Sequence, residues 1–88
     1  MKVSQEKKNK ILEQILAFLY TSSPKPIFTS HIAKEIARDE EFTKKLLIEL
    51  KTKGLVYEVK KNPKGKFYKK RSRWILSDKA YKSYQELL

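Results

Sequence analysis

Cysteine is absent from the 88-residue sequence, and histidine occurs only once, as His31. Without thiols the chain cannot build a disulfide scaffold, perform thiol chemistry or hold a metal through thiolates. A single imidazole would need several carboxylate partners to form a zinc or iron site. With only two glycines there is also no Gly-rich phosphate-binding loop. We therefore expect neither a metal nor a cofactor.

Long apolar runs are missing as well. No segment approaches the ~18 apolar residues that a membrane span requires. The first ten residues are polar or charged, and Glu13 and Gln14 interrupt the next apolar stretch, so no signal peptide is expected. These features predict a cytoplasmic, nucleoid-associated protein that does not contact a membrane.

Catalytic patterns are equally scarce. The sequence has no Ser-His-Asp order and no pair of separated carboxylates suited to acid–base work. Its one acidic cluster, Asp39-Glu40-Glu41, is contiguous and lies at an expected helix start. We expect that the protein is not an enzyme.

Positive charge is present in large excess. The sequence carries 21 Lys and Arg against 10 Asp and Glu, a net charge of +11, whereas small soluble domains usually carry ~2–8. Eight of these cations and no acid fall within residues 60–73. Such a chain is expected to bind a polyanion, nucleic acid first and an anionic membrane second. The abundance of Lys, Ile and Tyr also fits a thermophilic, archaeal source.

Apolar periodicity predicts one domain of four helices and short strands. A broad apolar stripe predicts a helix from Ser4 to about Tyr20, which Pro24 follows. Ile27-Phe28 is long enough for a short strand. Two helices follow, over about 30–38 and about 40–53.

Capping residues mark the ends of these two helices. Thr29 or Ser30 would cap the first at its N-terminus, and Asp39 would cap the second. Gly54 would end the second in a left-handed conformation.

Residues 55–76 predict a β-hairpin. Asn62-Pro63-Lys64-Gly65 is a turn sequence between two β-prone stretches. Ser77 then caps a last helix over about 78–88. One side of the first strand carries Leu55, Tyr57 and Val59, and the inward side of the second carries Tyr68, Trp74 and Leu76.

Three stretches resemble the winged helix-turn-helix family found in many bacterial and archaeal regulators: Thr29–Ala37, Leu47–Val56 and Trp74–Ala80. The likeness extends over about residues 8–85, with Ala80 where several members have glycine. It implies an α+β, mainly α fold: a single winged helix-turn-helix domain over 1–88. The recognition helix would be about 40–53, the wing about 55–76 and the C-terminal helix about 78–88.

The resemblance implies binding to double-stranded DNA and regulation of transcription. The recognition helix would enter the major groove, and the wing would contact the phosphate backbone or minor groove. The expected recognition-helix contacts are Glu41, Lys44, Lys45, Ile48, Lys51 and Thr52. The expected wing contacts are Lys60, Lys61, Lys64, Lys66, Lys69, Lys70, Arg71 and Arg73. Ser30, His31 and Lys34 of the preceding helix would reach the backbone, and Tyr81, Tyr84, Leu87 and Leu88 would form a homodimer interface between first and last helices.

Other functions fit the same residues. Because the wing carries more charge than the recognition helix, a nonspecific nucleoid or replication-accessory protein is one alternative. A protein-interaction module that meets an acidic surface is a second, since fold does not fix function. Binding to structured RNA is a third.

Overall fold

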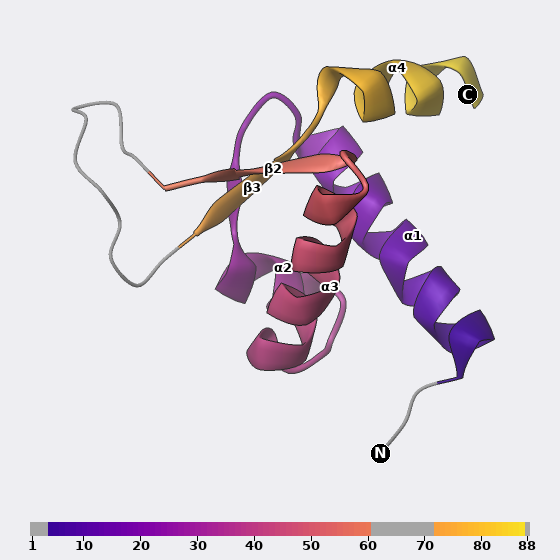
Figure 1. The fold of residues 1–88 in the computed structure, drawn as a ribbon. Coiled ribbons are helices and arrows are strands. Elements are labelled where there is room, and N and C mark those ends of the chain that lie inside the picture. The colour runs from indigo at the N-terminus through magenta and orange to yellow at the C-terminus, as the bar shows by residue number, and fades with distance from the viewer. Residues whose placement is uncertain (1–3, 61–71, 88) are drawn as a thin grey trace.

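Four helices and a small antiparallel sheet make up the computed structural model, which describes residues 4–60 and 72–87. This architecture confirms the expected mainly helical α+β class (Figure 1). The expected turn at 62–65 and the inward position of Tyr68 lie outside the described residues. In chain order the elements are α1 (Gln5–Ser22), β1 (Ile27–Phe28), α2 (Thr29–Glu35), α3 (Glu40–Thr52), β2 (Val56–Val59), β3 (Arg73–Leu76) and α4 (Asp78–Leu87).

Helix α1 begins where predicted and ends later than predicted. The Ser4 hydroxyl accepts the Lys7 backbone N–H at 3.2 Å, which caps the helix. The helix continues to Ser22 because a proline constrains only the residue directly before it. Here that residue is Ser23, which is extended with ψ 142°.

The N-cap predicted for helix α2 is wrong. Phe28 occupies the N-cap position and makes no side-chain cap, because β1 runs directly into the helix. Neither Thr29 nor Ser30 is therefore the cap. The helix also ends at Glu35 instead of Arg38, since Ala37 adopts a left-handed φ of 55°.

Both caps predicted for α3 are confirmed. Asp39 accepts the Phe42 backbone N–H at 3.1 Å. At the other end Gly54 has φ 76°. The Leu55 N–H then bonds to the Leu50 carbonyl at 2.9 Å, which is a Schellman ending.

The sheet has the strand order β1-β3-β2, with both pairings antiparallel. Trp74 of β3 lies between Ile27 of β1 and Glu58 of β2 in this register. Val56, opposite Leu76, is buried, whereas Tyr57 is exposed. The strand therefore turns Val56 and Glu58 toward the helices, which places Tyr57 on the outer face.

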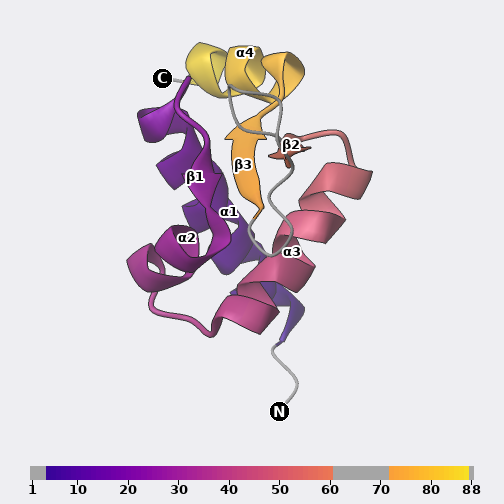
Figure 2. The same ribbon diagram turned by 90° about the vertical axis from the view of Figure 1, so that its left-hand side faces the viewer.

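The core lies between the inner face of the sheet and helices α1, α2 and α3. Trp74 is fully buried at its centre, and Leu76 is buried beside it, as predicted for the second wing strand. Helix α4 packs at the end of the molecule opposite α2 (Figure 2). No helix in the described ranges is long and apolar enough to cross a membrane.

Candidate nucleic-acid interface

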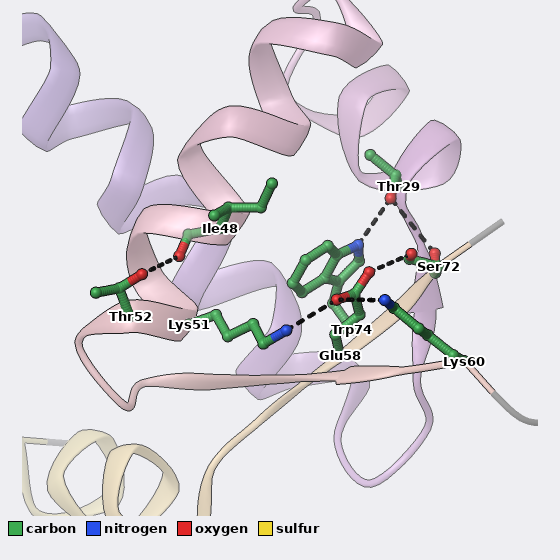
Figure 3. A network of polar contacts seen from close by, with 8 residues as sticks. All are labelled: Thr29, Ile48, Lys51, Thr52, Glu58, Lys60, Ser72 and Trp74. Carbon is green, nitrogen blue, oxygen red and sulfur yellow. Dashed lines mark hydrogen bonds and ion pairs between the residues drawn. The ribbon is translucent and has the colours of Figure 1, made fainter. Parts of the chain in front are cut away.

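Helix α3 presents one face to solvent. Lys44, Lys45 and Glu41 are exposed there, as helical projection predicts. Ile48 is 46% exposed, so an apolar side chain is accessible on this face. The Thr52 hydroxyl donates to the Ile48 carbonyl at 3.0 Å, so it is partly used within the helix (Figure 3). The face thus offers two lysines around one exposed apolar side chain.

Lys51, at the edge of this face, turns toward the wing. Its Nζ lies 3.0 Å from Glu58 Oε1, so the last turn of α3 is tied to strand β2. The sequence-based prediction placed Lys51 on the DNA-facing surface. The structure places its ammonium group at the junction of α3 and the wing.

Glu58 is the centre of that junction. Its side chain is only 9% exposed and also accepts a hydrogen bond from the Ser72 hydroxyl. Lys60 Nζ lies 3.8 Å from the same Oε1. Burial alone would raise the pKa of Glu58, but the hydrogen bonds from Ser72 and Lys51 and the lysine charges outweigh it, so this pKa lies below its ordinary 4.5.

Sequence reasoning missed Glu58 and Ser72 as site residues. The available signal was the position of Glu58, which is the last acid before the cation-rich run of residues 60–73. A lone carboxylate beside so many cations is expected to pair with some of them. Which cations it pairs with depends on how α3 packs against β2, which local sequence does not determine.

A second contact joins the wing to α2. The Trp74 indole N–H donates to the Thr29 hydroxyl at 2.7 Å in the buried core. The Thr29 hydroxyl in turn approaches the Ser72 carbonyl at 3.4 Å. The base of the wing is therefore attached to both helices of the helix-turn-helix (Figure 3).

Two of the eight predicted wing cations lie in the described part of the chain. Lys60 is exposed, and its ammonium group approaches Glu58. Arg73 is half-buried, with its guanidinium carbon 5.8 Å from the centre of the Phe28 ring. The remaining six lie outside the described residues: Lys61, Lys64, Lys66, Lys69, Lys70 and Arg71.

The predicted backbone contacts of α2 are all exposed. Ser30 and Lys34 face solvent. The His31 ring lies 5.7 Å from the ring of Phe18, so it rests against α1. This contact accounts for the position of His31 without a ligand.

The predicted dimer residues of α4 are only partly available. Tyr81 and Tyr84 each have ring centres 5.0 Å from that of Tyr20 on α1, so both tyrosines pack within the chain. Leu87, in contrast, is 83% exposed. Leu88 lies outside the described residues. The structure thus brings the first and last helices together and leaves Leu87 on their open side.

Helix α1 is also tied to α3. Lys8 Nζ lies 2.9 Å from Glu49 Oε1, and this hydrogen bond from Lys8 holds the pKa of Glu49 below its usual value. The described ranges contain no group of three or more His, Cys, Asp or Glu side chains that could hold a metal ion. The polar chemistry described here is therefore that of ion pairs and hydrogen-bond donors.

No protein-family model and no curated protein sequence matches the chain. Solved structures do match it. A MepR mutant from a multidrug-resistant S. aureus isolate superposes with a TM-score of 0.67 at 22% identity, over 91% of this chain and 62% of that one. A MepR mutant bound to an oligodeoxyribonucleotide gives 0.65 at 21% identity, over 94% of this chain and 66% of that one.

A protein of Ralstonia eutropha JMP134 gives a TM-score of 0.69 at 16% identity, over 90% of this chain and 95% of that one. The chain thus spans less than two thirds of the first MepR structure and nearly all of the Ralstonia protein. Together with the element order, these similarities show that the chain has the winged helix-turn-helix fold.

Proposed function

We propose that the protein binds double-stranded DNA and regulates transcription. The observation that carries this proposal is the exposed face of α3, where Lys44 and Lys45 lie one turn before the exposed Ile48. The sequence adds eight cations within residues 60–73. Lysine donates to guanine O6 and N7, and an apolar side chain contacts the thymine methyl group. A similar structure, that of a MepR mutant, was solved bound to an oligodeoxyribonucleotide.

The two parts of this surface have different roles in the proposal. The exposed face of α3 enters the major groove and reads base edges. The wing lies on the phosphate backbone or in the minor groove and supplies affinity, because phosphate contacts carry no sequence information. Ser30 and Lys34 of α2 add contacts to the backbone.

The first test is fluorescence anisotropy with a generic duplex of about 30 base pairs across a salt series. A log–log slope of about −4 to −8 would correspond to about five to nine neutralised phosphates. Absence of binding at low salt would contradict the proposal and favour a protein-interaction module. Competition with structured RNA in the same assay tests the RNA alternative.

A second candidate is a nonspecific DNA-binding protein of the nucleoid or of replication. It is favoured by the charge distribution, since eight cations fall within residues 60–73. Footprinting separates the two, because a regulator protects a discrete and often palindromic site, whereas an architectural protein coats any duplex.

We further propose that the protein acts as a homodimer through its first and last helices. Helix α4 carries two cations and two anions, so two copies can approach there without the repulsion expected of a chain with net charge +11. Leu87 supplies an exposed apolar contact on this helix. Sedimentation equilibrium at tens of micromolar should give twice 10.5 kDa, and a 10.5 kDa species would contradict the dimer.

A further inference from the structure

Two lysines from different elements share one carboxylate oxygen at the base of the wing. Lys51 comes from the last turn of α3 and Lys60 directly follows β2, and their ammonium groups lie 3.0 and 3.8 Å from Glu58 Oε1. They approach Glu58 from opposite sides (Figure 3). The lysine side chains are 50% and 58% exposed, against 9% for Glu58. The carboxylate is thus largely buried, whereas the two ammonium groups that contact it belong to exposed side chains.

The position of this carboxylate is fixed by other elements. Glu58 Oε2 accepts the Ser72 hydroxyl, and Ser72 is held in turn by the Thr29 hydroxyl at its carbonyl. Trp74, which lies opposite Glu58 in the sheet, is anchored in the core. Glu58 is therefore held by partners in and beside β3, and it contacts Lys51 through a hydrogen bond and Lys60 through a longer ion pair.

We propose that Glu58 is a positioning residue that holds Lys51 and Lys60 as a two-pronged clamp for one phosphate of the DNA backbone. This inference rests on the proposed DNA binding. Each ammonium group has three donors, so pairing with Glu58 leaves donors for a phosphate oxygen. One carboxylate against two lysines also leaves the cluster with a net positive charge.

Prior ordering of the lysines is what makes the clamp effective. A free lysine side chain loses rotamer freedom when it binds a phosphate, and holding it in the bound arrangement beforehand removes part of that loss. The location also suits a phosphate, because it lies between the helix proposed to enter the major groove and the wing. A phosphate flanking that groove would meet both lysines together.

If Glu58 had a different role, its removal would change the DNA affinity in the opposite direction. If the carboxylate only neutralised nearby lysines, its removal would strengthen DNA binding through simple electrostatics. If it positions them, its removal weakens binding even though the protein becomes more positive. The direction of the change therefore separates the two roles.

The decisive variant is Glu58→Gln, whose amide has nearly the same shape and can still accept from Ser72. We expect its affinity for the generic duplex to fall about tenfold, as for loss of a hydrogen bond to a charged group. The salt slope should decrease by about 0.9, equivalent to one phosphate. Unchanged or tighter binding by Glu58→Gln would overturn the clamp.

Glu13→Gln is the matched control, because it makes the same charge change at an exposed site on α1. It should bind as the wild type does. Ser72→Ala provides a variant with unchanged net charge, which removes the hydroxyl that fixes Glu58. It should weaken binding in the same direction as Glu58→Gln, and this loss cannot come from charge. Normal affinity in Ser72→Ala would contradict the part of the inference in which Ser72 fixes Glu58.

A double-mutant cycle distinguishes positioning from general loss of structure. Lys51→Gln should weaken binding in the wild-type background and have a much smaller effect in Glu58→Gln. Additive effects would contradict the inference. If the wild type does not bind duplex DNA, both the proposed function and the clamp are rejected. If it binds and Glu58→Gln binds equally well, only the clamp is rejected.

Discussion

The Trp74 indole donates to the Thr29 hydroxyl across 2.7 Å, and this buried bond joins strand β3 to the start of α2. Both residues are buried, so the N–H has no access to water. Thr29, the first residue of α2, thus uses its hydroxyl as the acceptor of a buried indole. The bond makes the orientation of the wing depend on the first helix of the helix-turn-helix.

Thr29→Val should destabilise the protein, because it leaves the Trp74 N–H buried without its acceptor. We expect the free energy of unfolding to fall by about 1–3 kcal/mol. Urea denaturation monitored by circular dichroism measures it. Thr21→Val is the matched control, since the Thr21 hydroxyl donates to the Phe18 carbonyl at an exposed site. If Thr29→Val lowers the free energy of unfolding no more than the control does, Thr29 is not needed as the acceptor of the Trp74 N–H.

Ala37→Gly should stabilise the protein. Ala37 has φ 55°, where a Cβ atom is unfavourable, and the bond from Arg38 N to the Ala33 carbonyl at 3.0 Å shows a Schellman ending. Glycine relieves this strain but adds entropy to the unfolded chain, so we expect a net gain of about 0.5–1 kcal/mol. Ala17→Gly, within α1, should instead lose about 0.5–1 kcal/mol. A loss in both variants would show that Ala37 carries no strain.

Stability should depend on pH through Glu58. Its pKa is lowered in the folded state, so its contribution is fully present above the ordinary value of 4.5 and is lost as pH falls through the lower folded pKa. The difference in unfolding free energy between wild type and Glu58→Gln should therefore be largest near pH 7 and smallest near pH 3. Urea denaturation at both pH values checks this. A difference that is independent of pH would contradict the pairing.

Recognition helix and wing should differ in what they contribute to binding. Replacing four wing lysines together by Gln should weaken binding to all duplexes alike and flatten the salt slope. These lysines are Lys64, Lys66, Lys69 and Lys70. Replacing Lys44 and Lys45 by Gln should lower the affinity for a preferred site more than the affinity for random DNA. Anisotropy with both duplexes provides the comparison. Identical behaviour of the two variants would refute this division of roles.

Leu87→Glu should disrupt the proposed dimer. Two copies that meet through α4 would then bury carboxylates at the position of an 83% exposed leucine. We expect sedimentation equilibrium to shift from dimer to monomer. Gln85→Glu is the control, because Gln85 is also exposed on α4 but belongs to the polar side of the helix. Equal dissociation in both variants would indicate a general effect of charge instead of a contact at Leu87.

Much of the fold was predictable because its determinants are local. Asp39 and Gly54 mark the ends of α3 through hydrogen bonds that reach only a few residues along the chain. The exposed face of α3 followed from helical geometry in the same way. The inward face of β2 was not predictable from alternation alone, since it depends on where the strand starts after the turn at Gly54.

The junction at Glu58 was missed for a related reason. Ser72 and Glu58 are 14 positions apart, and Thr29 and Trp74 are 45 apart. These partners meet only through the register of β3 with its two neighbours and the packing of α3 on β2. The sequence indicates that such polar groups need partners, but it does not identify them.

Trp74 is the only tryptophan in the chain, and it is fully buried beside the base of the wing. Its fluorescence emission therefore reports on one known position in the core without an attached dye. Unfolding exposes the indole to water and shifts its emission to longer wavelength. A shift on addition of duplex DNA, with the helices still folded, would instead report a rearrangement where the wing joins the core.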